Sequence, residues 1–531
     1  MPLPRGLTTV AAMLPVLLVA CGTAAGSRSS TGTPRSGGEL KFALPADPTC
    51  LDPHQAATSE GLYVARGLVD SLTDQNPTTG EIVPWLARSW NVGKDASEFT
   101  FHLREDATFA DGTPVDAEAV KRNLDDVAAL GARSILGSGF VQGYQATTVT
   151  GPHTAVVTFG GPNAQFLQAT STPTLGLLAP TSLSKGAEQR CTAGLVGSGP
   201  FQLGGYQTNR STTLTRRTGY AWPSPLSLHQ GDARLEKVTF LVMPESGVRT
   251  GSLTSGQVDG IAGVAPQDEP ALGGGRVSVL SRANPGVPVA FSVNTARPLA
   301  SNLAVRQALQ AAVNRAEVVD TVLSPSYRPA TSSLSSSTAN FTDNSPLLRH
   351  DPQTARRLLD GAGWQPGADG IRSHDGRRLT LEAILATNFG PNKAAVELIQ
   401  QQLRDVGIEL DLRILSIADY QQARGSGDYD LAWGSGTRAD PDILRTAFSD
   451  KLLNLSRIDD PDLQRDLDAQ AAAGDPKRRA ELVATAQRRV LEQAYQIPVF
   501  EMTTVFALSG KVHDIAFTSS SGLQYYDAWL S

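Results

Sequence analysis

The sequence predicts an α/β protein built from two or more lobes. Its 531 residues are 40% hydrophobic and 18% charged, which is the composition of a globular protein long enough for more than one hydrophobic core. Segments with the period-two alternation of strands are followed by segments with the apolar spacing of helices, early in the chain and again after about residue 290. Strands that alternate with helices favour a layered α/β architecture.

Two strands and one helix are predicted in the first part of the chain. The alternating apolar residues around Phe42 and around Phe101 each predict a strand with one buried face. Residues 111–114, Asp-Gly-Thr-Pro, have the composition of a turn. Asp116 is then placed to cap a helix with apolar residues at helical spacing. The inward-facing residues of this helix are predicted to be Val120, Leu124 and Val127.

The same alternation of strand and helix is predicted in the second part. Residues 287–315 contain a strand, a loop and a helix with its apolar residues on one side. Residues 394–415 are predicted to form a helix followed by a strand. Gly407 ends the helix, because glycine is the usual residue just after a helix C-terminus. The strand that follows is predicted from four alternating apolar residues, which are Ile408, Leu410, Leu412 and Ile414.

The N-terminal segment is predicted to be a processed leader. Arg5 precedes an apolar stretch that is too short and too interrupted by proline to span a bilayer as a stable helix. The stretch ends in Leu-Val-Ala-Cys at residues 18–21, which resembles the lipobox of bacterial lipoproteins. We therefore expect a signal peptide over residues 1–20, a lipid on Cys21 that holds the mature protein at the membrane, and a flexible Gly/Ser/Thr-rich tether over 21–38. The alternative is a simple secretory signal.

The other two cysteines, Cys50 and Cys191, are expected to form one disulfide, because an exported chain lies in an oxidising compartment. Two buried free thiols are the alternative.

Several function classes lack support in the sequence. The net charge of −6, with no basic block, argues against a nucleic-acid partner. Residues 182–185, Ser-Leu-Ser-Lys, fit the S-x-x-K pattern of penicillin-binding enzymes, but no S-D-N or K-T-G element follows. The seven histidines have no metal-site spacing. A binding protein without catalysis, cofactor or built-in metal site is therefore expected, and a secreted hydrolase is the weaker alternative.

A set of motifs in a constant order identifies a family. The most specific motif is LREDATFADGTPVDAEAVK, and others are LDPHQA, VGSGPFQL, SGQVDGI, AVRQALQAAVNR, DPQTARRLLDGAGW and YDLAWGSGTRADPDIL. Together they resemble the family 5 extracellular solute-binding proteins, the peptide, nickel and oligosaccharide receptors of ABC importers. The resemblance covers almost everything after residue 38.

The resemblance implies a periplasmic-binding-protein clamp of type II, in which two lobes enclose a small ligand. Lobe I would comprise residues 39–288 and 499–531, with an extra subdomain at about 70–195, and lobe II residues 289–498. The implied partners are a peptide-like, glycan-like or chelate ligand and the permease subunits of an importer, and the protein would act as a monomer. A ligand sensor that uses the same clamp without transport is the alternative.

The resemblance also places residues 428–442 at the cleft. The sequence predicts a buried strand that ends in a glycine loop at 434–438. Peptide binders of the family carry an aspartate four residues before the following proline, where it holds the peptide ammonium. Here that position is Thr437, which cannot neutralise an ammonium. Arg438 either faces solvent or pairs with an acidic or carbonyl-rich ligand. Asp440 is expected to cap the segment that follows.

The full set of predicted ligand-binding residues comprises Glu60, Tyr63, Asn388, Phe389, Trp433, Gly434, Ser435, Gly436, Thr437, Arg438 and Asp440.

Overall fold

The computed structural model describes residues 32–273, 275–386, 389–452 and 454–531. The predicted signal peptide and Cys21 lie outside the described residues. Contacts divide the chain into residues 1–33 and a compact unit of residues 34–531.

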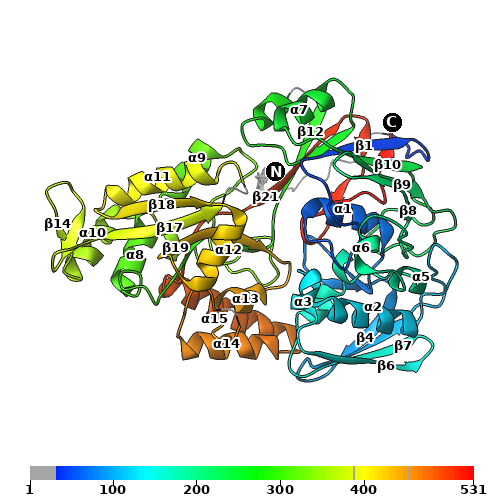
Figure 1. The fold of residues 1–531 in the computed structure, drawn as a ribbon, viewed down its shortest axis with the longest axis horizontal. Coiled ribbons are helices and arrows are strands. Elements are labelled where there is room, and N and C mark those ends of the chain that lie inside the picture. Colours follow the sequence, from blue (N-terminus) through cyan, green and yellow to red (C-terminus); the bar gives the residue numbers. More distant parts are fainter. Residues whose placement is uncertain (1–31, 274, 387–388, 453) are drawn as a thin grey trace, which may run out of the picture. The chain divides into compact units, whose positions relative to one another are not determined.

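A seven-stranded sheet forms the centre of one lobe (Figure 1). From edge to edge its strands are β12 (Val277–Ala283), β21 (Thr503–Ser509), β11 (Gly260–Ala262), β1 (Glu39–Leu44), β10 (Lys237–Val242), β9 (Ser211–Arg216) and β8 (Phe201–Gln207). Strand β1 is the strand predicted around Phe42, and it runs parallel to β10 and β11. The side chains of Leu40, Phe42 and Leu44 are fully buried, as the predicted alternation requires, and Ala43 is buried as well because β1 lies in the middle of the sheet.

A five-stranded sheet forms the centre of the other lobe. Its order is β18 (Glu409–Leu415), β17 (Thr380–Ala386), β19 (Leu431–Thr437), β13 (Gly286–Val293) and β20 (Gln496–Phe500). The predicted helix and strand of residues 394–415 are α11 (Asn392–Arg404) and β18. Ile414 was predicted to lie on the buried face of this strand, but it is 43% exposed. The reason is that β18 is the edge strand of the sheet, and its C-terminal end extends beyond the core.

A smaller subdomain is attached to the first sheet. It contains the four-stranded antiparallel sheet β4 (Ala87–Val92), β5 (Glu98–Leu103), β7 (Thr154–Phe159) and β6 (Tyr144–Gly151), covered by α2 (Ala117–Leu130). Asp116 caps α2 as predicted, with its carboxylate accepting the Ala119 N–H at 2.8 Å. The predicted apolar face of α2 is buried, and Phe99 and Phe101 of β5 pack edge-on against Phe166.

The chain passes between the two large sheets at two adjacent places. Strand β12 ends at Ala283 before β13 begins, and β20 ends at Phe500 before β21 begins. The two passages are joined, because the Asn284 N–H donates to the Met502 carbonyl at 2.7 Å. We name residues 39–283 with 503–531 lobe I and residues 286–500 lobe II. These limits differ by a few residues from the expected 288/289 and 498/499.

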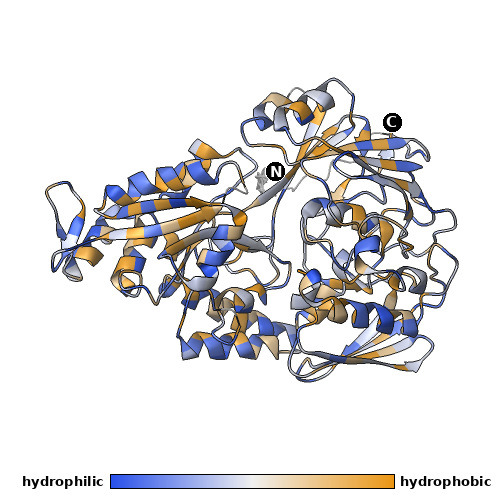
Figure 2. Cartoon of the chain, viewed as in Figure 1, coloured by the Kyte–Doolittle hydropathy of each residue, from blue (hydrophilic) through white to orange (hydrophobic). Residues whose placement is uncertain are grey.

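The remaining elements complete the two lobes. In lobe I they are α1 (Ser59–Leu68), β2 (Thr73–Gln75), β3 (Ile82–Pro84), α3 (Gly137–Phe140), α4 (Phe166–Ala169), α5 (Pro180–Leu183), α6 (Ala187–Arg190), α7 (Ser246–Thr254), β22 (Val512–His513), β23 (Ala516–Phe517), β24 (Leu523–Gln524) and β25 (Trp529–Leu530). In lobe II they are α8 (Leu303–Ala312), α9 (Arg315–Val322), α10 (Pro352–Gly361), β14 (Gln365–Pro366), β15 (Arg372–His374), β16 (Arg377–Arg378), α12 (Ile417–Ser426), α13 (Ile443–Phe448), α14 (Pro461–Ala471) and α15 (Pro476–Glu492). Figure 2 shows apolar residues concentrated on the central strands, with polar residues along the outer sides of the helices.

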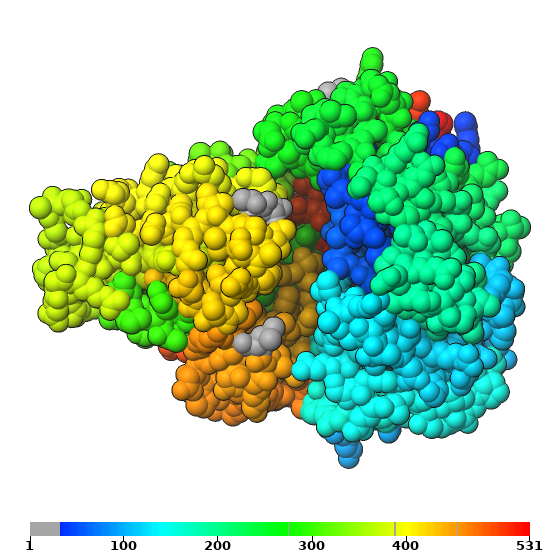
Figure 3. Space-filling view, viewed as in Figure 1, coloured from blue at the N-terminus to red at the C-terminus, as the bar shows by residue number. Residues whose placement is uncertain are grey.

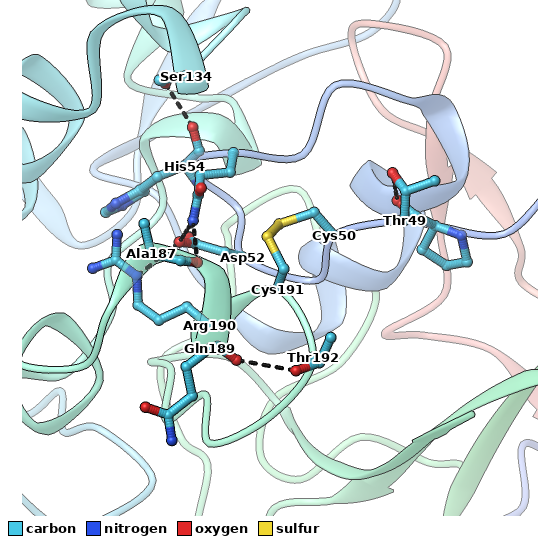
Figure 4. Close-up of a disulfide and its surroundings, with 12 residues drawn as sticks. Thr49, Cys50, Asp52, His54, Ser134, Ala187, Gln189, Arg190, Cys191 and Thr192 are labelled. Carbon is cyan, nitrogen blue, oxygen red and sulfur yellow. Dashed lines mark hydrogen bonds and ion pairs between the residues drawn. A yellow bond between two sulfur atoms is a disulfide. The ribbon is translucent and has the colours of Figure 1, made fainter. Parts of the chain in front are cut away.

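The segment before α1 is fastened to α6 by a disulfide between Cys50 and Cys191 (Figure 4). Beside it the guanidinium of Arg190 pairs with Asp52 at 2.9 Å, and both side chains are buried. The same guanidinium donates two hydrogen bonds to Asp126 of α2. Two cysteines distant in sequence are thus held together by a covalent bond and by a buried charged group.

His54 contacts the same Asp126 carboxylate as Arg190. Its Nδ1 lies 2.8 Å from the Asp126 carboxylate and its Nε2 lies 3.1 Å from the Gly176 carbonyl oxygen. The Asp126 carboxylate and the Gly176 carbonyl oxygen are both acceptors, so each contact is a hydrogen bond when the ring nitrogen that makes it carries a proton. Burial on its own would raise the pKa of Asp126, but the hydrogen bonds from His54 and Arg190 lower it below its usual value.

Candidate ligand-binding cleft

A groove lies between the lobes at the carboxyl ends of three strands of lobe II. Strands β17, β18 and β19 are parallel, so their last residues, Ala386, Leu415 and Thr437, lie along the same edge of the sheet, the one formed by the strand ends. Gly286, where the chain enters lobe II, pairs with Thr437 at this edge. Figure 3 shows the surface hollowed between lobe II, in yellow, and the blue N-terminal part of lobe I. Residues at this edge of the sheet are therefore placed to meet a ligand held between the lobes.

The predicted glycine loop is a strand in the structure. Strand β19 continues to Thr437 because its backbone pairs with β13, including Gly434 with Ala290 and Thr437 with Gly286. The prediction of a loop was wrong because backbone pairing outweighed the low strand propensity of glycine. Gly286 has a φ of 114°, and a Cβ there would lie 2.2 Å from the Gly436 carbonyl oxygen, so the register requires glycine at this position.

The two glycines of β19 serve packing. A Cβ on Gly434 would lie 3.1 Å from the Tyr420 hydroxyl of α12, and one on Gly436 would lie 3.2 Å from Cδ1 of Ile443 in α13. Both distances are tighter than normal contacts, so the absence of side chains lets the two helices lie against the strand. The exposed residues of this segment are Ser435 and Thr437, and their hydroxyls are the polar groups that β19 presents.

Trp433 belongs to the core of lobe II. It is 2% exposed, its ring packs 4.7 Å from that of Phe291, and its Nε1 donates to Oδ1 of Asn392 at 2.9 Å. The expected ligand contact of Trp433 stays a prediction, and this structure gives the side chain a packing role. Its place is to fix β19 against β13 and α11.

Asp440 is likewise a structural residue. It is 3% exposed, and Arg479 of α15 donates to both of its carboxylate oxygens, at 2.6 and 2.8 Å. Oδ1 also accepts the Asp442 N–H at 2.8 Å, in the turn that leads into α13. The predicted role in that turn agrees with this bond, and the predicted ligand contact stays a prediction that would have to compete with the pairing to Arg479.

Arg438 joins the two lobes. Its Nη1 donates to Oε1 of Gln165 in lobe I at 3.1 Å and to Oγ1 of Thr446 in lobe II at 2.9 Å. Its guanidinium carbon lies 5.5 Å from the centre of the Phe140 ring, also in lobe I. Burial lowers the pKa of Arg438, and the nearby carboxylates of Asp442 and Asp440 oppose that shift. The side chain is therefore not the solvent-facing arginine of the first alternative, and its pairing with an acidic or carbonyl-rich ligand stays a prediction.

A second contact accompanies this one. The Ala164 N–H of lobe I donates to the Ala471 carbonyl at the end of α14 at 3.0 Å. The sequence offered no signal for Gln165 or Phe140, since neither belongs to a motif and Gln165 lies 273 positions from Arg438. Only the fold brings them together.

Glu60 is the acidic residue at the start of α1. Burial raises its pKa, and hydrogen bonds at the helix start and the charge of Arg249 oppose the shift. Among the described residues no cation forms an ion pair with it. Arg249 is committed elsewhere, since it donates to four carbonyl oxygens, those of Met243, Pro244, Ala262 and Gly263.

The other predicted residues have different outcomes. Tyr63 is 6% exposed and packs against Phe506, with the ring centres 5.7 Å apart, so it belongs to the core of lobe I, and its predicted ligand contact stays a prediction. Phe389 is half-buried, 6.2 Å from the ring of Tyr327, in the loop after β17. Asn388 lies outside the described residues.

The S-x-x-K match does not form a catalytic pair. The Ser182 hydroxyl accepts the Val196 N–H at 2.7 Å, and the Lys185 ammonium donates to the Gly194 carbonyl at 2.5 Å. Each group thus serves the loop around residue 195.

Within the described ranges, no group of three or more His, Cys, Asp and Glu side chains is placed to hold a metal ion. A search of the same ranges for a helix of membrane-spanning length and hydrophobicity gave none.

Sequence comparison resolves the family. The profile described as "Bacterial extracellular solute-binding proteins, family 5 Middle" matches residues 81–450, well over half of the chain. The chain belongs to this family. It is therefore a solute-binding protein of the ABC-importer type, with the expected two-lobe α/β fold.

Two curated relatives resemble this solute-binding protein over most of its length. The nickel-binding periplasmic protein of Escherichia coli K12 is 25% identical over 479 residues, which are 87% of this chain and 88% of the relative. The glutathione-binding protein GsiB of Salmonella paratyphi A is 24% identical over 510 residues, 93% of this chain and 94% of the relative.

Solved structures agree on the fold. NikA of Brucella suis in complex with Fe(III)-EDTA superposes with a TM-score of 0.80 at 25% identity, covering 93% of this chain and all of NikA. DppA of Helicobacter pylori in complex with the peptide STSA gives a TM-score of 0.73 at 21% identity, covering 93% of this chain and 98% of DppA.

Proposed function

We propose that this protein is an extracytoplasmic receptor, anchored to the membrane by a lipid on Cys21, that captures a small solute between its lobes and delivers it to an ABC permease. Membership of the family and the groove between the lobes support this role. The lipobox-like sequence at residues 18–21 supports the anchor.

We propose further that the solute is not a peptide held by a free N-terminal ammonium. The observation that carries this is the composition of the β19 end, where Ser435 and Thr437 present hydroxyls and the nearest carboxylate, Asp440, is paired with Arg479. An ammonium placed there would lose its hydration without gaining a counter-charge, which costs several kcal/mol. A neutral or glycan-like solute, an anionic solute, a chelate, or a peptide with a blocked amine suits hydroxyl groups better.

The names of the relatives support a choice wider than peptides. Their names and structures refer to nickel, glutathione, Fe(III)-EDTA and short peptides, so ligand chemistry within the fold varies with the residues around the groove. Here Glu60 is the half-buried acid near the groove without an ion-pair partner among the described residues. It is the position from which a cationic part of a solute would be recognised.

The proposal is tested by identifying the solute that co-purifies with the protein. Native mass spectrometry of protein from its own host would give the mass of a bound solute, and calorimetry with the identified compound would give its affinity. Uptake of the labelled compound should fall when the gene is deleted. Binding without any loss of uptake would assign the protein to sensing instead of import.

A further inference from the structure

A small cavity lies between the lobes, next to the place where the chain crosses from one to the other. Its empty volume is about 160 Å³ including its mouth. Lobe I contributes Gln75 at the end of β2, Arg282 near the end of β12, and Ser519, while lobe II contributes Ser337 and Ala439. That volume includes open solvent, and the enclosed part has room for a single species of about the size of a water molecule, which excludes a peptide or a sugar.

Arg282 carries a charge that nothing in the described part of the chain neutralises. Burial is the only influence on its pKa, which falls to about 10, and no carboxylate opposes that shift. Its Nη1 donates to the Ser519 carbonyl at 3.0 Å and to Oγ of Ser521 at 2.6 Å, and its Nη2 donates to the Pro77 carbonyl at 2.6 Å. A guanidinium has five N–H donors, so these bonds leave two without a partner among the described residues.

A second donor at the cavity also lacks an acceptor. The hydroxyl oxygen of Ser337 is buried and makes no hydrogen bond with any described group. The amide oxygen of Asn76, another lining residue, accepts the N–H groups of Thr78 and Thr79, so its amide nitrogen is the end left to donate. The lining is therefore rich in donors and poor in acceptors.

Arg315 is a buried arginine whose hydrogen bonds can be compared with those of Arg282. It also lacks a carboxylate partner, but it donates to four backbone carbonyls, those of Gln310, Val313, Leu348 and Pro498. Carbonyl dipoles meet its charge on several sides. Arg282 instead lines a cavity, keeps two N–H groups without a partner among the described residues, and has no carboxylate beside it, which favours a negative group in that cavity.

We propose that this cavity binds a small inorganic anion, with chloride as the species that fits its size. The anion would accept from the unused N–H groups of Arg282 and from the Ser337 hydroxyl. A water molecule would fill the space but would leave the charge uncompensated. Because Arg282 belongs to lobe I and Ser337 to lobe II, the anion stabilises the arrangement of the lobes seen here. Ala439 of the same cavity directly follows Arg438, which makes the inter-lobe contact.

Two measurements on the purified full chain test the site without any knowledge of the solute. Crystals soaked in sodium bromide should show an anomalous peak within hydrogen-bonding distance of Arg282. The melting temperature should rise with sodium chloride, in a saturable way, above its value in sodium gluconate of equal ionic strength. Arg282→Met should abolish this difference, and Ser337→Ala should reduce it severalfold.

The matched control is Arg88→Met, which removes an exposed arginine of lobe I outside the cavity and should keep the full chloride response. If Arg282→Met does not fold, Ser337→Ala and the bromide map decide. A cavity that holds only water in bromide, or a chloride response that is identical in the wild type, Arg282→Met and Ser337→Ala, would overturn the proposal. Neither result depends on whether the protein is an importer receptor.

Discussion

Nη1 of Arg438 lies 3.1 Å from Oε1 of Gln165, and this hydrogen bond connects β19 of lobe II to the segment just before α4 of lobe I. The guanidinium also lies over the Phe140 ring and donates to Thr446, so it is held from both lobes at once. A clamp that opens would have to break the bonds to lobe I while keeping the bond to Thr446.

The first prediction concerns this inter-lobe contact. Arg438→Ala and Gln165→Ala should each shift the protein toward separated lobes, because each removes the same hydrogen bond. In a double-mutant cycle on the free energy of unfolding, the coupling should be about 1 kcal/mol, the value expected for a partly exposed bond to a charged donor. Small-angle scattering should show a larger radius of gyration for both single variants.

The control for this prediction is Thr446→Val. It removes the acceptor of Arg438 inside lobe II and leaves the bond to Gln165 in place, so the radius of gyration should stay at the wild-type value. Additive effects of Arg438→Ala and Gln165→Ala would show that the contact does not hold the lobes together.

The second prediction concerns peptide ligands. Short peptides with a free N-terminus should bind weakly or not at all, because the β19 end offers the hydroxyl of Thr437 where an ammonium would need a carboxylate. Calorimetry with matched free and acetylated peptides measures this. Tight binding that acetylation abolishes would contradict the proposal, and loss of that binding in Glu60→Gln would then identify Glu60 as the ammonium partner.

The third prediction concerns the disulfide. Replacing Cys50 and Cys191 together by serine should lower the free energy of unfolding, by up to roughly 5 kcal/mol for a loop of this length and by less in practice. The loss should be smaller if the ion pair between Arg190 and Asp52 keeps the segments together. Peptide mapping without reduction should recover one linked pair, and two free thiols in the exported protein would rule the disulfide out.

The fourth prediction concerns the carboxylate of Asp126. Asp126→Asn should destabilise the protein by about 2–4 kcal/mol at neutral pH, because it leaves Arg190 and His54 without their shared partner. The folded-state pKa of Asp126 is lowered, so its contribution is fully present above the unfolded pKa of about 4 and is lost as the pH falls through the folded value.

Chemical denaturation of both proteins from pH 7 to pH 3 measures this difference. The difference in the free energy of unfolding between wild type and Asp126→Asn should stay constant down to about pH 4 and then become smaller. Asp462→Asn is a suitable control, since the Asp462 side chain is 55% exposed and its ion pairs with Arg465 and Arg489 should each contribute less than about 1 kcal/mol. A gap that widens in acid would contradict the sign of the pKa shift.

The fifth prediction concerns the membrane anchor. Cys21→Ser should release the protein from the membrane, because a diacylated cysteine is the only attachment that the leader sequence predicts. Membrane fractionation after a salt wash, with mass spectrometry of the mature N-terminus, checks this. An unchanged membrane-bound fraction in the variant would refute the lipobox interpretation.

The sequence by itself determined the local elements and the family. The alternation around Phe42 and Phe101, the cap at Asp116 and the stop at Gly407 could be predicted because each depends on residues close together in the chain. The order of the motifs was sufficient to predict the two-lobe clamp, since family resemblance depends on the same local stretches.

Only the tertiary structure decided what the residues near the groove do. Residues 434–437 became a strand because β13 supplied backbone partners, and Asp440 is paired because Arg479 reaches it from α15. Gln165 gives no signal in the sequence yet accepts a hydrogen bond from Arg438 across 273 positions, and Arg282 and Ser337 line one cavity although they belong to different lobes. Such contacts depend on how distant segments pack, and no periodicity or motif records that geometry.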